Sequence, residues 1–437
     1  MATPWHHLYK TMLKKTFFSA YRILCPVLCL IVILLTSCGK QDSTAEWMAQ
    51  YEQNLPQIWI YGEGYEHVED LLQKHNKVSS HPFHVVKYSE NEISYEQFST
   101  KLSSSLMTES GPDIVISDDP NLFINTYKLI DAGVLQSFDP ITKGWERDAY
   151  YPKMLDGSRA ADGQVYILPI SIDLQLIATT ENTMNQYSLT EDDFSNFSKT
   201  TDTLENLYRQ TDTAVYDGFY RMTAMVPSVF DRENRETALL EPYYTELFQK
   251  WYDLRILNSN QQQLALALLP VDYVADGKQL FHFWKFSDYL SAWIEANMQK
   301  SYTVEQWKNL KILPMNDTDG KMAGEIRYYA LFPKSSDQTE AVADLLNTLL
   351  FRDGWESAMG LGGDLWLSKH MMQESLEPYG FPIESAEALC DNLMALTIHD
   401  DAMEAFDIEL DRLISKSPIG SADWAELERS INIYLSE

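Results

Sequence analysis

Short apolar runs alternate with helical patterns from residue 58 onward. Residues 58–61, 83–88 and 113–116 each predict a strand, because they are short apolar stretches bounded by turn residues. The segments between them carry apolar side chains at the spacing of one helical face, namely Tyr65, Val68, Leu71, Leu72 and His75 in the first and Tyr95, Phe98, Leu102 and Leu106 in the second. Strands that alternate with helices predict an α/β fold with a parallel sheet covered on both faces.

Capping and turn residues extend this pattern along the chain. Ser94 and Gln97 form a capping box before the second helix, and Asp337 with Glu340 predicts another before an apolar helical stripe at 341–349. A helix at 121–131 should stop at Gly133, and Gly163 predicts a turn into an extended segment that ends at Pro169. Residues from about 182 to 263 are polar and mainly helical, without a repeat.

Polar side chains follow two of the predicted strands at the point where each ends. In open α/β sheets, ligands bind beyond the carboxyl ends of strands. That rule indicates a binding role for five residues, namely Tyr61, Glu63, Ser117, Asp118 and Asp119. The alternative is that they are ordinary solvated loop residues.

The first 38 residues have the pattern of an export signal. Residues 1–22 contain four basic side chains and no acid, residues 23–35 are almost wholly apolar, and Leu35-Thr36-Ser37-Cys38 follows. The apolar run is shorter than the ~20 residues that a membrane helix needs. The alternatives are an ordinary signal peptide or an uncleaved anchor, and Met12 is an alternative start of the chain.

Composition limits the classes of partner. The net charge is −30, and removal of the signal takes away basic side chains only and leaves about −34. Such acidity argues against nucleic-acid binding, which needs basic side chains. Of the four cysteines only Cys390 would remain as a thiol, in a helical context typical of a small buried residue. A chain of this length exceeds one core, so we expect two lobes.

The order of several motifs resembles the extracellular solute-binding proteins of ABC importers, the group that includes maltose-binding protein. The matching segments are 58–65, Gly111-Pro112-Asp113-Ile114-Val115, 131–140, Asp162–Pro169 and the tail 430–437. The start is similar to bacterial lipoprotein signals, whose Leu-x-Ser/Ala/Gly-Cys box places a lipid on the cysteine, here Cys38. The chain departs from the family pattern at Glu181-Asn182-Thr183 and through about 182–310.

The resemblance implies two α/β lobes of the type II periplasmic-binding-protein fold, joined by hinge crossovers around a ligand cleft. We expect crossovers near 170–177, 327–332 and 362–366. The expected organisation is a signal peptide at 1–37, a tether at 38–50, lobe one at 51–172 plus about 330–365, and lobe two at 173–329 plus 366–437. Four further ligand contacts are named as candidates at Asp173, Trp284, Tyr328 and Trp366, although core packing is the more common role of such residues, since buried Trp is frequent.

The function implied is a monomeric, lipid-anchored receptor on the outer face of the cell membrane, in a Gram-positive bacterium. It would capture a small solute, a sugar or oligosaccharide, and deliver it to an ABC permease without doing chemistry. The alternatives are a sensory receptor of the same fold coupled to a kinase, and a secreted glycosidase, whose two carboxylates leave no motif.

Other chemistry finds no support in the sequence. The third glycine of a dinucleotide loop is replaced by His67, and position twelve of a calcium loop at Asp317–Gly320 is Ile326 rather than glutamate. His81 and His84 lack the spacing of a metal site. We therefore expect neither a cofactor nor a metal.

Overall fold

The computed structural model divides the chain into two units, Met1–Leu55 and Pro56–Glu437, and all the helices and strands described here belong to the second. The residues that the structure describes are 55–61, 66–88, 93–108, 111–117, 126–217, 225–231, 234–259, 274–299, 310–351, 364–397, 401–414 and 419–436. Cys38, Glu63, Asp118 and Asp119 lie outside these ranges. No helix within the described ranges is both long and apolar enough to cross a bilayer.

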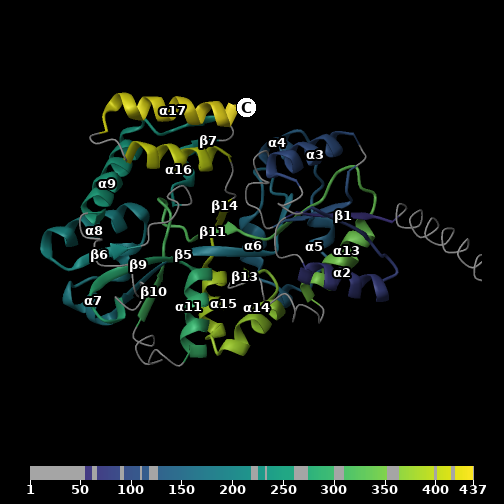
Figure 1. The fold of residues 1–437 in the computed structure, drawn as a ribbon, viewed down its shortest axis with the longest axis horizontal. Coiled ribbons are helices and arrows are strands. Elements are labelled where there is room, and N and C mark those ends of the chain that lie inside the picture. Colours follow the sequence, from purple (N-terminus) through teal and green to yellow (C-terminus); the bar gives the residue numbers. More distant parts are fainter. Residues whose placement is uncertain are drawn as a thin grey trace, which may run out of the picture. The chain divides into compact units, whose positions relative to one another are not determined.

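A five-stranded sheet in the order β2-β1-β3-β12-β4 forms the first half of the fold (Figure 1). Its strands are β1 (Gln57–Tyr61), β2 (His84–Tyr88), β3 (Ile114–Ser117), β4 (Ile167–Pro169) and β12 (Tyr329–Leu331). The three strands expected before residue 120 are confirmed, and β1 pairs in parallel with β2 and β3. The expectation of a parallel sheet holds only there, because β12 arrives from far along the chain and pairs antiparallel with β3 and β4.

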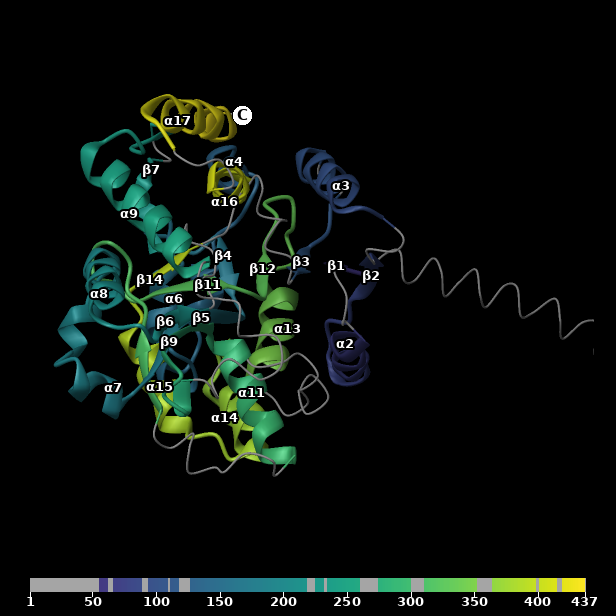
Figure 2. The same cartoon turned by 60° about the vertical axis from the view of Figure 1, so that its left-hand side comes forward.

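Helices cover both faces of this sheet, as alternation along β1 requires. Ile58 and Ile60 pack toward α2 (Glu66–Val78) and α13 (Thr339–Phe351) in one cluster. Trp59 and Tyr61 pack toward α3 (Tyr95–Met107) and α4 (Thr126–Asp131) in another. Figure 2 shows α2 and α3 on opposite sides of β1 and β2.

The expected helix boundaries are met in part. Ser94 caps α3 through the full capping box with Gln97, as predicted. Gly133 ends α4 with a φ of +65°, a left-handed conformation that glycine adopts without strain. The capping box expected at Asp337 is wrong, because α13 begins two residues later at Thr339 and the Asp337 carboxylate accepts from Gln338 Nε2 at 2.6 Å.

A second sheet is organised around the long buried strand β5 (Ser171–Thr180). One flank of β5 pairs with β10 (Leu310–Pro314) and then β11 (Ala323–Ile326), and the other with β9 (Gln279–Lys285) and then β13 (Leu365–Trp366). All four are antiparallel to β5. Two outer strands pair in parallel, β6 (Ala214–Asp217) with β9 and β14 (Ala395–Thr397) with β11.

Helices also cover both faces of the second sheet. One core lies beneath α8 (Phe197–Gln210), α9 (Pro242–Ser259), α16 (Asp401–Ile414) and α17 (Ser421–Ser436). The other lies beneath α11 (Phe286–Gln299), α14 (Lys369–Leu376) and α15 (Ile383–Asn392), where the buried thiol of Cys390 packs. In Figure 1, α9, α16 and α17 lie above β5, and α11, α14 and α15 lie below it.

The region expected to be mainly helical, about 182–263, is only partly so. It holds α7 (Glu181–Gln186), α8 and α9, but also β6 and the small hairpin of β7 (Phe230–Asp231) and β8 (Glu236–Thr237). The remaining short helices are α5 (Asp139–Thr142), α6 (Pro152–Gly157) and 3-10 turns at Arg147–Ala149, Glu191–Phe194, Pro227–Val229 and Glu377–Tyr379. The polar composition concealed these strands because they are short, and β6 pairs only with the remote strand β9.

Candidate functional site

The carboxyl ends of β1, β3 and β4 meet at one edge of the first sheet. The backbone register places Tyr61 beside Ser117, Ser117 beside Tyr329, and Tyr329 beside Pro169. From this edge the chain crosses to the second sheet at Ile170 and returns at Arg327 and Tyr328. A third crossover, whose residues 352–363 lie outside the described ranges, arrives at Asp364 and β13.

Of the five ligand contacts predicted at strand ends, the structure describes Tyr61 and Ser117. Both lie at this edge, and both are buried. The Tyr61 ring stacks on Phe98 with centroids 4.6 Å apart, within the core under α3. The Ser117 hydroxyl donates to the Tyr61 carbonyl oxygen at 3.4 Å. Ser117 therefore contributes to the packing of the edge. Asp118 and Asp119 follow it directly and lie outside the described ranges.

Polar side chains gather on one face of β5 where the crossovers reach it. Because side chains alternate along a strand, Ser171, Asp173 and Gln175 share a face that is opposite to Ile172 and Leu174. The register brings Glu325 opposite Asp173, Lys285 opposite Gln175, and Trp366 opposite Ser171, all on that same face. Ser171, Asp173, Lys285, Glu325, Arg327 and Asp364 form what we call the crossover cluster.

Asp173 is the best-connected carboxylate of the cluster. It is 2% exposed, and Ser287 donates to it from its backbone nitrogen at 3.1 Å and its hydroxyl at 2.6 Å. Its Oδ1 also accepts from Leu174 N at 2.9 Å, in the gap between β9 and β13 where neither strand pairs with β5. Burial raises the pKa of Asp173, although the charges of Lys285 and Arg327 and the Ser287 bonds oppose the rise.

Two cations balance part of this negative charge. Lys285 Nζ lies 3.0 Å from Glu325 Oε2, and both side chains are largely buried. Burial alone would lower the pKa of Arg327, but the charges of Asp364, Asp173 and Glu325 outweigh it and raise that pKa. The Nε of Arg327 is buried without a hydrogen-bond partner among the described residues. An unmet donor of this kind can bind a solute oxygen.

The predicted aromatic contacts separate into two groups. Tyr328 and Trp366 stack at 6.0 Å with an interplanar angle of 14°, directly beside the crossover cluster. Trp284 lies opposite Leu176, and therefore on the other face of β5, where it packs against Tyr289 and the core under α11. The structure thus brings together Asp173, Tyr328 and Trp366 and places Trp284 in a different layer.

The sequence reasoning missed most of the charged residues of the cluster. Ser171, Lys285, Glu325, Arg327 and Asp364 were not among the expected contacts. One signal was present in the sequence, because Ser171, Asp173 and Gln175 alternate with apolar residues in an otherwise apolar strand. The other residues come from remote segments, and no local pattern joins them to β5.

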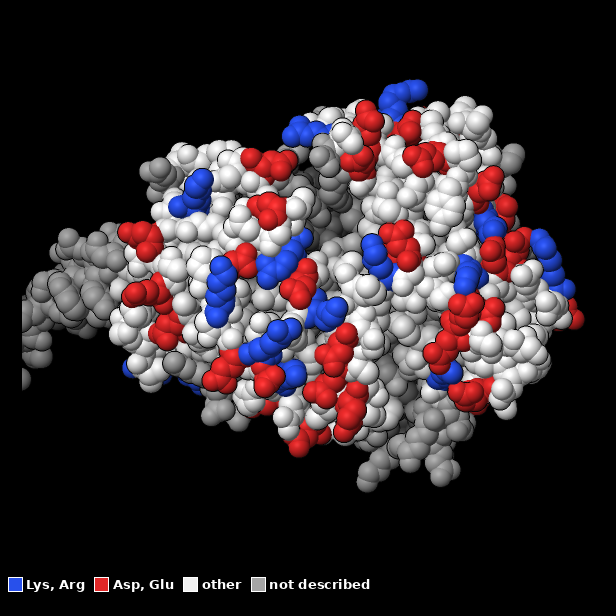
Figure 3. All heavy atoms as spheres, turned by 180° about the vertical axis from the view of Figure 1, so that it is seen from behind, with Lys and Arg blue, Asp and Glu red and all other residues white. Residues whose placement is uncertain are grey.

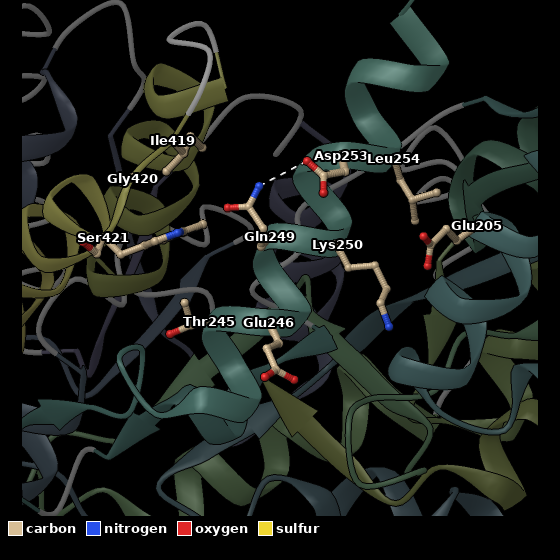
Figure 4. A pocket seen from close by; sticks show the side chains of 11 residues that line it. Glu205, Thr245, Glu246, Gln249, Lys250, Asp253, Leu254, Ile419, Gly420 and Ser421 are labelled. Atoms are coloured by element: carbon tan, nitrogen blue, oxygen red, sulfur yellow. Dashed lines mark hydrogen bonds between the residues drawn. The ribbon is translucent and has the colours of Figure 1, made fainter.

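A separate cavity of about 580 Å³ lies among α8, α9 and the start of α17. Figure 4 shows Thr245, Glu246, Gln249, Lys250 and Asp253 of α9 on one side and Ile419 to Ser421 at the start of α17 on another. Gln249 Nε2 donates to Asp253 Oδ1 at 3.1 Å. None of the predicted contacts that the structure describes lines this cavity, so it is distinct from the crossover cluster.

Two other kinds of site are relevant to the described part of the chain, a metal centre and a basic surface. Among the described residues, no three His, Cys, Asp or Glu side chains are grouped closely enough to hold a metal ion. On the face shown in Figure 3, Lys and Arg side chains are interspersed with Asp and Glu. That face therefore offers no uninterrupted basic surface of the kind that nucleic acids require.

Solved structures share this arrangement of sheets. The sugar-binding protein MalE from Xanthomonas citri matches with a TM-score of 0.61 and 13% identity over 88% of this chain and 98% of that one. A family 1 extracellular solute-binding protein from Alicyclobacillus acidocaldarius gives 0.58 and 13% over 88% and 98%. The cyclic alpha-maltosyl-1,6-maltose binding protein of Arthrobacter globiformis gives 0.53 and 16% over 87% and 98%.

At such low identity these structures show the fold, and it is the type II two-lobed fold expected from the sequence. No curated protein sequence matches the chain. The model of the family described as bacterial extracellular solute-binding protein matches residues 79–354, which is more than half of the chain. The resemblance seen in the sequence is therefore confirmed, and the chain belongs to the bacterial extracellular solute-binding proteins of ABC transporters.

Proposed function

We propose that this protein is a lipid-anchored receptor that captures a sugar or oligosaccharide outside the cell and delivers it to an ABC permease. The observation that carries the proposal is the stacked pair Tyr328 and Trp366 beside the carboxylates of the crossover cluster. Aromatic faces pack against sugar rings, and carboxylates and guanidinium groups bind hydroxyls. Capture of this kind needs no bond to be made or broken.

Several proteins with solved structures of this fold bind carbohydrates, which supports a carbohydrate as the solute. They include a cyclic maltosyl-maltose binding protein, a receptor with an exclusive preference for β-D-galactopyranose, and a protein in complex with cycloalternan. These solutes are uncharged. The cluster suits such a solute, because its two cations already face buried carboxylates.

A thermal-shift screen of the full-length chain in detergent against a carbohydrate library would test solute capture. A ligand that binds only the folded state raises the melting temperature. For a carbohydrate that does so, Trp366→Ala and Tyr328→Ala should each weaken binding by about tenfold or more in calorimetry. Trp145→Ala, which alters a half-buried ring outside the cluster, is the matched control and should bind normally. Full affinity in both site variants would contradict the assignment.

The remaining predicted contacts stay part of the proposal. Glu63, Asp118 and Asp119 would join Tyr61 and Ser117 at the strand ends of the first sheet, and Asp173 would contribute from β5. Trp284 would act only indirectly, through the core beneath β5. Glu63→Ala should weaken binding if its carboxylate touches the solute. An unchanged dissociation constant would remove Glu63 from the site.

We propose the domain organisation given by the sequence, with lobe one at 51–172 plus about 330–365 and lobe two at 173–329 plus 366–437. The strands support it, since β1 to β4 and two of the three residues of β12 fall in the first set, and the second sheet falls in the other except for the first two residues of β5 and Leu365 of β13. Bound solute should slow hydrogen exchange at the crossovers and in both sheets. Protection confined to one sheet would contradict closure of two lobes.

Anchoring and delivery are proposed from the sequence. Mass spectrometry should find a mature chain that begins at a diacylated Cys38, and Cys38→Ser should release the protein from the membrane of a Gram-positive host. An intact, unmodified N-terminus would refute the anchor.

Permease genes beside the coding sequence would support transport, whereas a membrane histidine kinase would favour sensing. Glycoside hydrolysis by the purified protein would overturn a pure binding role.

A further inference from the structure

Hydrogen bonds of Ser171 join the first crossover to the second, and another hydrogen bond of Ser171 joins the third crossover to them. The Ser171 carbonyl oxygen accepts from Arg327 N at 2.9 Å, and its hydroxyl oxygen accepts from Tyr328 N at 3.3 Å. The same hydroxyl donates to Asp364 Oδ2 at 2.9 Å. Ser171 is fully buried, so water does not compete for these bonds.

Neighbouring backbone bonds repeat the connection. Ile170 N donates to the Tyr328 carbonyl oxygen at 2.7 Å, and Leu367 N donates to the Ile170 carbonyl oxygen at 2.9 Å. Asp364 is the side chain through which the third crossover joins this hydrogen-bond network. Any relative movement of the two sheets must change the dihedral angles of these few residues.

Asp364 lies among charges on every side. The charged groups that act on it are the negative Asp173 of β5 and the positive Arg327 of the second crossover and Lys285 of β9, and Glu325 of β11 acts in turn on Arg327. Lys285 is already paired with Glu325 at 3.0 Å. Asp364 and Asp173 are each 2% exposed, and the only cations that offset these two carboxylates among the described residues are Arg327 and Lys285, which is also paired with Glu325.

We propose that the hydrogen bond between Ser171 and Asp364 is a tie between crossovers that protonation controls. Neutral Asp364 holds the third crossover to Ser171, and ionised Asp364 weakens the hydrogen bonds that join the three crossovers. The neutral acid adds no repulsion against Asp173, whereas the ionised acid places a second buried negative charge beside it. The proposal concerns the hinge itself and holds whichever solute the protein binds.

The direction of the pH effect follows from the environment. Burial, and then the charge of Asp173, raise the pKa of Asp364 to about 8, whereas a loosened and hydrated Asp364 would return toward its ordinary value near 4. The tied form therefore binds a proton that the loosened form releases between these two values. The tie weakens progressively as the pH rises from about 4 toward 8 and changes little above 8.

Hydrogen exchange of the full-length chain in detergent at pH 5.5 and pH 8.5, corrected for the intrinsic effect of pH, would test the tie. Peptides that carry the amides of Ile170, Arg327, Tyr328 and Leu367 should lose protection by about tenfold or more at pH 8.5. In Asp364→Asn the same peptides should change by less than about twofold, because the amide cannot ionise. Peptides from β1 to β3 should hardly change in either protein.

The matched control is Asp317→Asn, which neutralises another buried carboxylate, in the turn between β10 and β11 and away from the crossovers. This variant should keep the wild-type pH effect at the crossovers. If Asp364→Asn does not fold, Ser171→Ala keeps the acid but removes its donor, and should expose the crossover amides already at pH 5.5. The proposal is overturned if Asp364→Asn retains the pH effect, if Ser171→Ala leaves the amides protected, or if all wild-type peptides change alike.

Discussion

Single residues show how burial and neighbouring charge set the properties of this protein. Asp173 is the clearest case. Its carboxylate accepts hydrogen bonds from Leu174 N and Ser287 Oγ where neither β9 nor β13 pairs with β5, and it faces the charges of Lys285 and Arg327. A buried charge is costly unless hydrogen bonds and opposite charges surround it. Asp173 has both, and its neighbours depend on it in turn.

Replacing Asp173 should therefore destabilise the fold more than replacing its partner. Asp173→Ala leaves Ser287 N and Leu174 N without their side-chain acceptor and removes a negative charge that faces Lys285 and Arg327, and should lower the free energy of unfolding by about 3 kcal/mol. Ser287→Ala removes one hydroxyl bond and should cost about 1 kcal/mol. Urea unfolding measures both values. Equal stability of the two variants would show that Asp173 does not organise this region.

The stability of the whole protein should depend on Asp364 in a pH-dependent way. Its pKa of about 8 in the folded state exceeds its unfolded value of about 4, so the folded state binds the extra proton and loses stability as the pH rises between these values. Asp364→Asn should gain about 2 kcal/mol relative to wild type at pH 8 and much less at pH 5. Urea midpoints at both pH values measure this. A constant difference between the proteins would contradict it.

At the scale of elements, local sequence signals decide where helices and strands begin. The α3 helix starts at Ser94 because its hydroxyl and the Gln97 side chain satisfy backbone donors that the helix leaves open. The α13 helix shows the limit of such signals, since Asp337 and Glu340 fit the same pattern and the helix still begins at Thr339.

Removal of the α3 cap should have a measurable cost. Ser94→Ala loses the side-chain acceptor for Gln97 N and should destabilise the protein by about 1 kcal/mol. Ser104→Ala lies exposed inside the same helix and is the matched control, expected to be neutral or slightly stabilising because alanine favours helices. Thermal unfolding would compare them. A control as damaging as Ser94→Ala would refute the capping argument.

Close packing at Gly324 limits what β11 can accept. A Cβ there would lie 3.0 Å from Leu396 Cδ2 and 3.1 Å from Leu174 Cδ2. Gly324→Ala should therefore cost about 1–3 kcal/mol through overpacking. The double variant with Leu396→Val, which removes a crowding methylene, should recover part of the loss in chemical unfolding. A double variant less stable than the sum of its single changes would contradict this explanation.

At the scale of the whole molecule, β5 brings together strands that lie far apart in the sequence. It receives strands from four segments between residues 279 and 366, and its apolar face belongs to a core that also holds Ile58 and Ile60 of the first sheet. The two sheets therefore share buried surface as well as crossovers.

This shared core predicts cooperative unfolding. Leu174→Ala removes a side chain that is 1% exposed within the shared core, and should cost about 3 kcal/mol and lower hydrogen-exchange protection in both sheets. Leu427→Ala alters only the core beneath α17 and is the comparison, expected to affect the second sheet first. Two well-separated unfolding transitions in the wild-type protein would contradict a shared core.

The sequence by itself determined the local elements and the family. Periodicity located β1, β2, β3, α2 and α3, because side-chain spacing and caps act within a few residues. The ordered motifs were sufficient for the family, which the match over residues 79–354 confirmed. These features depend on neighbours in the chain, and a sequence displays such neighbours directly.

Only the tertiary structure decided which polar groups share the candidate site. Ser171 meets Asp364 across 193 positions, and β12 enters the first sheet between strands that precede it by more than 150 residues. The tertiary structure also placed Trp284 on the far face of β5, away from Trp366. Register and burial set these contacts and the pKa of Asp364, and both arise only when remote segments pack together and exclude water.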